Sequence, residues 1–364
     1  MSAAAFRLDE MPASVLVIVT RRIGDVLLTA PLVRSLKAAW PQARIDLLVF
    51  RGTEGVLAGD PDIGRILVVP DEGRLKFLRG LRRRYDLAVS TSPSDRPTFY
   101  AWLAGRRRIG VMTRGAGSAL KRALLDAAVE FDNLDVHTVV QNLLLADLLG
   151  LPRHVDFPLA AAPADEAALA LAFPGFRSTR YAVLHLHPKF TYKMWHDDGW
   201  RELARWLQTR GLAVVLTGGA DAQESRHVRT FAQSLDAAPV DLSGRLDFRQ
   251  LALLLRHARL YVGPDTVTTH LAAAVGTPSV ALFGPSNPVK WGPWPGGCEE
   301  RVSPYVRKGT QRRGNVALVQ GGGACVPCLQ EGCARHVHSE SVCLQMLPAA
   351  TVIDAAAKML GEAA

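Results

Sequence analysis

The chain has 364 residues, of which 48% are hydrophobic and 21% are charged, values that are ordinary for a globular protein. At roughly 100–200 residues per domain this length predicts two domains, and the composition argues against a disordered chain, a collagen-like chain or a small disulfide-stabilised scaffold. The formal net charge of +9 is unusual, and it favours an anionic partner: nucleic acid, an acidic membrane surface or a phosphorylated small molecule.

Targeting and membrane signals are absent from the sequence pattern. Residues 1–12 include three charged side chains and lack an apolar run of signal-peptide length. No stretch approaches 18 uncharged apolar residues, so no membrane span is predicted and we expect a cytoplasmic protein. In such a protein five cysteines argue against a disulfide framework.

The first half of the chain alternates short apolar runs with a helical pattern. Its predicted elements are strands at 15–19, 45–50, 65–69 and 86–90 and a helix at 25–39. Because the apolar runs lack polar alternation, both faces of these strands are expected to be covered, which predicts a parallel sheet of βαβ units. The pattern is indistinct between 112 and 136.

The segment 157–179 is rich in Ala and Pro and is interpreted as an interdomain linker with one short helix at 165–171. The βαβ pattern then restarts, with strands at 181–186, 212–217, 260–262 and 279–283 and helices at 198–208, 221–235, 248–257 and 265–274. We therefore predict an α/β protein of GT-B-like architecture, with two Rossmann-like doubly wound domains facing a central cleft. The predicted domains are 1–170 and 171–348, and a C-terminal helix in 349–364 is expected to pack back on the first domain.

Ligands of open parallel sheets bind at the carboxyl ends of strands, so motifs at strand ends carry the most weight. Gly24 and Asp25 follow the first strand, where glycine permits a tight turn. Asp25 is either an N-cap of the next helix or a general base, since its carboxylate is ionised at neutral pH and can take a proton from an attacking hydroxyl.

A second motif, residues 263–270, follows the strand at 260–262 and opens a helix. Its free N–H groups form an anion site suited to a diphosphate, and Thr266 and His270 lie on one face, where both can donate hydrogen bonds. The simpler interpretation is a capped helix with a packed histidine. Asp265 suits the helix start in either case.

Two further loops follow strands of the second domain. Residues 185–195 contain two histidines together with Lys189 and Lys193, which form either a cationic pocket or ordinary solvated charges. Gly218 and Gly219 end the next strand, and Glu224 one turn later can hold a ribose hydroxyl. No G-x-G-x-x-G sequence follows any strand, so the dinucleotide-binding fingerprint is missing.

Four of the five cysteines fall within 19 residues, at Cys325, Cys328, Cys333 and Cys343. The C-x2-C spacing and four thiolates suit a structural zinc or iron, whereas the alternative is a reduced cysteine cluster that packs a loop. The positive charge is also concentrated: residues 73–122 contain thirteen Lys or Arg and two acids. This segment alone carries +11, so an anionic partner is expected at the first domain, although charge runs also occur on ordinary solvated faces.

The chain resembles glycosyltransferase family 9, the lipopolysaccharide heptosyltransferases. The resemblance rests on RRIGDVLLTAP at 21–31, KMW at 193–195, the long segment 242–294 and the cysteine-rich segment 325–344. The KMW and C-x-P-C elements are most similar to the heptosyltransferase III branch.

The resemblance implies an inverting transfer of heptose from ADP-heptose to an anionic inner-core lipopolysaccharide acceptor, with no metal needed for catalysis. Asp25 matches the catalytic base and Lys193 the lysine that neutralises the donor phosphates. Nucleotide-sugar contacts are implied for Gly24, Lys189, Glu224, Asp265, Thr266, Val267 and His270. Val267 departs from the family pattern, which usually has a small residue there.

Two alternatives differ in the partner. The first keeps the chemistry but modifies a protein hydroxyl, as in autotransporter heptosyltransferases with an iron-binding cysteine element. The second is a nucleic-acid-binding protein, which the chain argues against because its basic segment lacks interleaved aromatics and a recognised binding motif. We therefore expect a cytoplasmic enzyme that contacts the inner membrane peripherally and binds no nucleic acid.

Overall fold

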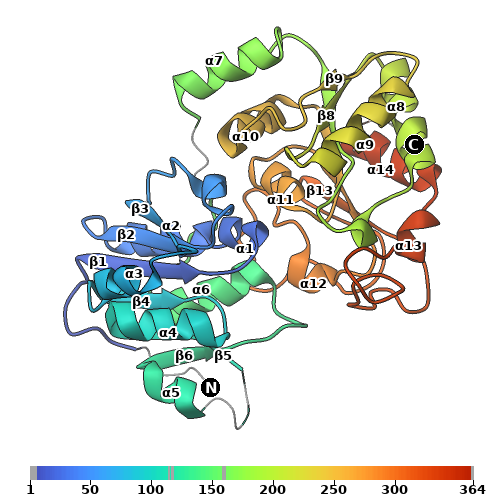
Figure 1. The fold of residues 1–364 in the computed structure, drawn as a ribbon. Coiled ribbons are helices and arrows are strands. Elements are labelled where there is room, and N and C mark those ends of the chain that lie inside the picture. The colour runs from blue at the N-terminus through green and yellow to red at the C-terminus, as the bar shows by residue number, and fades with distance from the viewer. Residues whose placement is uncertain (1–5, 114, 116–118, 158–160, 362–364) are drawn as a thin grey trace. The chain divides into compact units, whose positions relative to one another are not determined.

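A computed structural model provides the structure, which describes residues 6–113, 115, 119–157 and 161–361 (Figure 1). The chain divides into two compact units, Met1–Ala160 and Ala161–Ala364, called unit 1 and unit 2 below. Helix α7 (Pro163–Ala172) belongs to unit 2, because it packs against α10 (Phe248–His257) and its Asp165 pairs with Arg249 at 3.1 Å. The division therefore lies ahead of the predicted boundary at 170/171, and residues 158–160 of the predicted linker lie outside the described residues.

Unit 1 is built on a six-stranded parallel sheet with the strand order β3-β2-β1-β4-β5-β6. Its strands are β1 (Ser14–Val19), β2 (Arg44–Val49), β3 (Arg65–Val68), β4 (Tyr85–Ser90), β5 (Gly105–Met112) and β6 (Ala127–Glu130). Its helices are α1 (Ile23–Leu27), α2 (Ala30–Ala39), η1 (Glu54–Leu57), α3 (Arg74–Leu81), α4 (Asp95–Ala104), α5 (Ala119–Leu124) and α6 (Thr138–Leu148). Helix α2 packs with α6, whereas α4 packs with α3 and α5, so helices cover both faces of the sheet as predicted.

Unit 2 has a seven-stranded sheet in the order β12-β13-β11-β10-β7-β8-β9, parallel except for the pair β12 and β13. Its strands are β7 (Tyr181–His185), β8 (Ala213–Thr217), β9 (Val240–Asp241), β10 (Leu260–Pro264), β11 (Ser279–Phe283), β12 (Gln311–Arg313) and β13 (Val316–Gln320). Besides α7 and α10 its helices are η3 (Thr191–Lys193), α8 (Asp197–Thr209), α9 (Ala222–Gln233), α11 (Val267–Ala274), α12 (Pro288–Trp291), α13 (Val342–Gln345) and α14 (Ala349–Met359).

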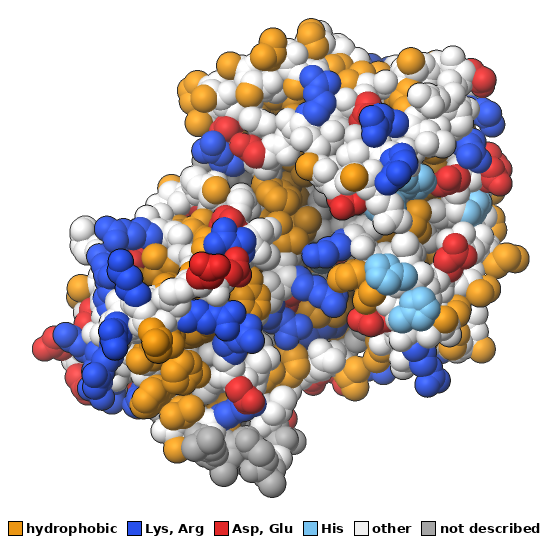
Figure 2. All heavy atoms as spheres, in the orientation of Figure 1, with side chains coloured by type: hydrophobic (Ala, Val, Ile, Leu, Met, Phe, Trp, Pro, Cys, Tyr) orange, Lys and Arg blue, Asp and Glu red, His pale blue; other side chains and the backbone are white. Residues whose placement is uncertain are grey.

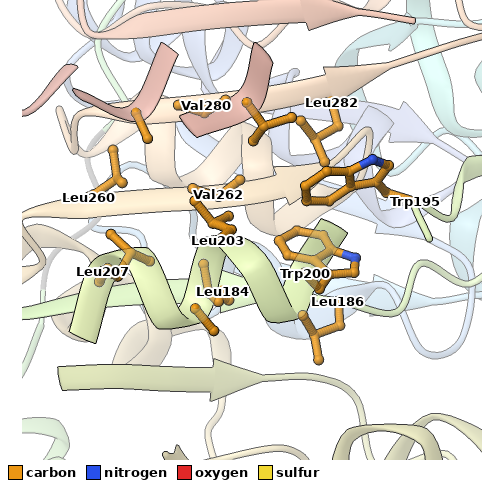
Figure 3. Packing of buried hydrophobic residues seen from close by; sticks show 14 of the residues in the cluster. Leu184, Leu186, Trp195, Trp200, Leu203, Leu207, Leu260, Val262, Val280 and Leu282 are labelled. Atoms are coloured by element: carbon orange, nitrogen blue, oxygen red, sulfur yellow. The ribbon is translucent and has the colours of Figure 1, made fainter. Parts of the chain in front are cut away.

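The main core of unit 2 lies between this sheet and the helices α8 and α14. Trp195 and Trp200 are almost fully buried in it and lie side by side, with ring centroids 5.0 Å apart (Figure 3). The indole N–H of Trp195 donates to the carbonyl of Leu347 at 2.8 Å, which ties the loop after β7 to the segment before α14. The tryptophans thus anchor the backbone that carries Lys193.

The C-terminal helix was predicted to pack on the first domain, but α14 packs on its own unit. Val352 and Ala356 are fully buried, and α14 contacts α8 and the strands β10, β11 and β13. Its apolar stripe is thereby used to cover the second sheet. Among residues 6–113, 115, 119–157 and 161–361, no helix combines the length and apolar character needed to cross a bilayer.

Candidate active site

The order of the parallel strands reverses between β1 and β4 in unit 1 and between β7 and β10 in unit 2. The crevice outside the carboxyl ends of the strands at such a point is where open α/β sheets bind ligands. The motif with Asp25 follows β1, and the motifs with Lys193 and Asp265 follow β7 and β10. These three motifs therefore lie at a reversal of strand order. Their sequences could not show this, because strand order is known only once the pairing of the strands is known.

Asp25 is a buried carboxylate at the unit 1 reversal, with 8% of its surface exposed. The Nε atom of Arg21 lies 3.0 Å from its Oδ1. The N-cap interpretation of Asp25 is wrong, because Arg22 is the N-cap of α1 and Asp25 lies inside the first turn, next to Gly24. The predicted helix at 25–39 is also two helices, because α1 ends at Leu27 and α2 begins at Ala30, with Pro31 in its first turn.

The Lys193–Asp265 ion pair lies at the unit 2 reversal. The Nζ of Lys193 is 2.6 Å from Oδ2 of Asp265 and also donates to the Asp265 carbonyl at 3.1 Å. The hydroxyl of Ser286 donates to the same carboxylate at 2.7 Å. Burial alone would raise the pKa of Asp265, but the charges of Lys193 and His270 and the hydrogen bonds from Lys193 and Ser286 together outweigh it and hold that pKa below its ordinary value. A fixed cation thus stands between the ends of β7 and β10.

The helix that follows β10 begins two residues later than predicted, at Val267, and Asp265 is not its cap. The N-cap is Thr266, whose side chain accepts no hydrogen bond from a backbone N–H of the first turn. The N–H groups of that turn are therefore not used by the cap and face the strand end, as an anion site requires.

His270 lies one turn into the same helix and is 5% exposed. Its Nε2 is 3.8 Å from Oδ1 of Asp265, and its Nδ1 has no hydrogen-bond partner among the residues that the structure describes. Burial lowers the pKa of His270 to about 4, so the ring is neutral at neutral pH. A neutral ring next to the ion pair can donate one hydrogen bond without adding charge.

Glu224 and Lys189 are placed differently from each other. Oε1 of Glu224 accepts a hydrogen bond from the Gly219 N–H at 2.6 Å, which fixes the carboxylate against the strand-end glycines. Burial raises the pKa of Glu224. Lys189 is exposed on the loop after β7.

Two groups at this edge were missed by sequence reasoning. Ser286 lies in the loop after β11, and the strand-end position of Pro285-Ser286-Asn287 was a usable signal. His227 in α9 bonds to His187 and to Asp197, and nothing in the local sequence marks it because its partners are 30 and 40 residues away.

The four clustered cysteines are free thiols, with Cys325 and Cys333 exposed. Burial raises the pKa of Cys343 to about 11, and the charges of Cys328, Cys333 and Cys325 add to the shift, so the four sulfurs share one neighbourhood. Within the described part of the chain, however, no three or more His, Cys, Asp or Glu side chains form a group that could hold a metal ion. The structural zinc or iron stays a prediction, which elemental analysis of protein purified without chelator tests.

Comparison with known proteins gives consistent matches. The profile of glycosyltransferase family 9 (heptosyltransferase) matches residues 74–311. Lipopolysaccharide heptosyltransferase 3 of Escherichia coli is 29% identical over 290 residues, which cover 74% of this chain and 83% of the relative.

Solved structures match over nearly the whole chain. E. coli ADP-heptose lipopolysaccharide heptosyltransferase II has a TM-score of 0.73 at 21% identity, covering 95% of this chain and 98% of that one. The iron-containing dodecameric glycosyltransferase TibC from enterotoxigenic E. coli H10407 has a TM-score of 0.56 at 17% identity, covering 96% and 76%.

Proposed function

The chain belongs to glycosyltransferase family 9, the heptosyltransferases, and on that premise we propose that it transfers a heptose from ADP-heptose to an inner-core lipopolysaccharide acceptor. Its GT-B fold of two Rossmann-like units supports this. The observation that carries the proposal is the buried Lys193–Asp265 pair beside the uncapped start of α11, at the strand reversal of unit 2. A lysine and a helix N-terminus at one strand end are suited to a nucleoside diphosphate.

The proposed reaction is an inverting displacement. The acceptor oxygen forms a bond to the anomeric carbon of the heptose while the bond from that carbon to the ADP oxygen breaks. Asp25 takes the proton of the acceptor hydroxyl, and ADP leaves with the electron pair. Lys193 and the N–H groups of α11 bind the departing diphosphate more tightly as its charge grows, which lowers the barrier.

A transfer assay tests the function and the acceptor together. The protein is incubated with ADP-heptose and a set of truncated core acceptors, and the product linkage is determined by NMR. Transfer with inversion to a phosphorylated core is expected. Transfer to a protein hydroxyl alone would show that the acceptor is a protein and not the lipopolysaccharide core. Binding to duplex DNA without binding to ADP-heptose would overturn the proposed function.

Asp25→Asn tests the base. The amide keeps the size of the side chain but cannot take a proton, so turnover is expected to fall by about 10²-fold or more. Binding of ADP, measured by calorimetry, is expected to stay unchanged because the nucleotide is assigned to unit 2. Turnover near the wild-type rate would remove Asp25 from the mechanism.

We also propose that unit 1 contacts an anionic membrane surface through the helices α3 and α4. Leu75, Phe99 and Trp102 are exposed by 73%, 39% and 42%, although large apolar side chains are costly to leave in water. The rings of Phe99 and Trp102 lie 5.8 Å apart on one face of α4. This exposed aromatic pair is suited to a lipid interface.

Basic side chains lie on α3, the helix that packs beside α4. Arg74, Lys76 and Arg79 are exposed on α3, and Figure 2 shows Lys and Arg beside hydrophobic side chains over these helices. The two acidic residues of the basic segment 73–122 are already paired, Asp95 with Lys121 at 2.7 Å and Asp86 with Arg106 at 3.4 Å. Exposed aromatics with basic neighbours fit the interface of an anionic bilayer, which on this proposal is the cytoplasmic face of the inner membrane.

Vesicle sedimentation tests the membrane proposal. The wild type is expected to bind vesicles that contain phosphatidylglycerol and to bind pure phosphatidylcholine weakly. The double variant Phe99→Ser/Trp102→Ser is expected to lose about tenfold or more in binding. The matched control is Leu171→Ser on α7, where an equally apolar residue is 85% exposed in unit 2. Equal loss in the control, or none in the double variant, contradicts the proposal.

A further inference from the structure

His187 stands at the strand reversal of unit 2, and the mechanism above leaves it unused. It follows β7, which lies between β10 and β8 in the sheet. The end of β10 carries Asp265, and the end of β8 carries the glycines that hold Glu224. His187 therefore lies at the sheet edge between the two loops that are assigned to the nucleotide sugar.

His187 is the first of three side chains in a hydrogen-bonded row, which come from the loop after β7, from α9 and from α8. Nδ1 of His187 is 3.0 Å from Nδ1 of His227 in α9. Nε2 of His227 is 2.9 Å from Oδ1 of Asp197, the first residue of α8. His187 is 8% exposed and the His227 side chain 18%, so neither ring rotates freely in solvent.

The row determines which nitrogen carries each proton. A carboxylate only accepts, so Nε2 of His227 must donate to Asp197. When the ring of His227 carries one proton, the other nitrogen, Nδ1, is then an acceptor, and Nδ1 of His187 must donate to it. The remaining nitrogen of His187, Nε2, is left with a free lone pair at the strand end.

The surroundings of His187 favour its neutral ring. Burial and the neighbouring His227 lower the pKa of His187, and they outweigh Asp221 and Asp197, which act in the opposite direction. His185 on β7 is buried, and burial together with His187 lowers its pKa to about 4. The hydrogen bond from His227 lowers the pKa of Asp197, which therefore stays charged.

We propose that Nε2 of His187 is a binding group that accepts a hydrogen bond from a hydroxyl of the nucleotide sugar, and that His227 and Asp197 are its positioning residues. The inference rests on the proposed function for the identity of the ligand. The hydroxyl belongs either to the ribose or to the transferred sugar. A bound proton would reverse the row, because His227 would then donate through Nδ1 and His187 would present an N–H in place of its lone pair.

Calorimetry on the full-length protein tests the binding group with ADP-heptose, ADP and inorganic diphosphate. His187→Phe keeps an aromatic ring but removes both ring nitrogens, and it is expected to raise the Kd of ADP-heptose about tenfold, the usual effect of one lost hydrogen bond. The Kd of ADP rises equally if the hydroxyl is that of the ribose and stays unchanged if it is that of the sugar. The affinity for diphosphate stays unchanged in both cases. An unchanged Kd for ADP-heptose overturns the inference.

Asp197→Asn tests the row without touching the ligand. The amide no longer requires a donor at Nε2 of His227, so both tautomers are populated and the Kd of ADP-heptose is expected to rise about threefold. The matched control is Asp198→Asn, the exposed neighbour on the same helix, which is expected to leave the Kd unchanged. If the two substitutions raised the Kd equally, the effect would come from losing a carboxylate at the start of α8, and not from the hydrogen-bonded row.

Ring ¹⁵N chemical shifts of the unliganded protein provide a readout that is independent of the function. They are expected to show His187 protonated at Nδ1 and His227 at Nε2, and a mixture in Asp197→Asn. The opposite tautomers overturn the inference. Failure of the wild type to bind ADP-heptose, with the expected tautomers in place, would instead count against the proposed function.

Discussion

The Lys193–Asp265 pair is expected to affect both the stability of the fold and the binding of ADP. Asp265 is 8% exposed, so its carboxylate is costly to bury without the ammonium 2.6 Å away. The same ammonium is assigned to the donor phosphates, which must compete with Asp265 for it. A change at Lys193 should therefore alter the fold and the binding of ADP in separable ways.

Lys193→Ala is expected to lower the free energy of unfolding by about 3 kcal/mol, because a buried carboxylate loses its partner. The Kd of ADP is expected to rise at least about tenfold through the lost charge-assisted contact. The double variant Lys193→Ala/Asp265→Asn should regain most of the stability but none of the affinity. Denaturant unfolding and calorimetry measure the two effects, and recovery of ADP binding in the double variant would exclude a phosphate contact by Lys193.

Asp60 is a buried carboxylate with an unfavourable environment. Its Oδ1 accepts from the Asp62 N–H at 2.9 Å, whereas its Oδ2 is buried and has no partner among the described residues. Burial and the charge of Asp62 raise the pKa of Asp60 to about 6, although Arg34 opposes the shift. The folded state therefore binds this proton more tightly than the unfolded state does.

The stability that Asp60 contributes is present below its unfolded pKa of roughly 4 and is lost as the pH rises to roughly 6. Asp60→Asn removes this loss and is expected to raise the free energy of unfolding by about 1–3 kcal/mol at neutral pH, with little effect near pH 4. Urea titrations at the two pH values measure the difference. Asp71→Asn, at an exposed carboxylate, is the control and should change stability at neither pH.

Secondary-structure elements were predictable where local signals agree. The helix at 248–257 was located at its exact bounds, because Asp247 and Gln250 form a reciprocal capping box in front of an apolar stripe. Strand β5 escaped detection, since Arg106, Arg107 and Arg108 interrupt its apolar pattern. Such a strand is recognised only by its pairing with β4 and β6.

Helix α14 shows what an element gains from its tertiary partners. Val352 is fully buried against the second sheet, whereas its neighbour Thr351 is exposed. Val352→Ala is expected to lower the free energy of unfolding by about 2 kcal/mol through lost apolar contact and a residual cavity. Thr351→Ala should stay within about 0.5 kcal/mol. Denaturant unfolding distinguishes them, and equal effects would mean that α14 does not pack as described.

The division into two units predicts a separable nucleotide function. All residues assigned to the donor except Gly24 lie in Ala161–Ala364, which has its own sheet and core. Residues 161–364 expressed alone are therefore expected to fold and to bind ADP within about threefold of the full-length Kd. Circular dichroism confirms folding before calorimetry is done. A folded fragment that fails to bind ADP would show that unit 1 contributes to the nucleotide site.

The sequence by itself determined the α/β class, the order of most elements and the strand-end motifs, because these depend on periodicity and on neighbours along the chain. It also indicated Asp25, Lys193 and Asp265, since each follows a recognisable strand. Strand order, the partners of Asp265 and the row behind His187 depend on residues that are distant in sequence. Only the tertiary structure decides such contacts, because burial and hydrogen bonding between separate elements leave no local pattern.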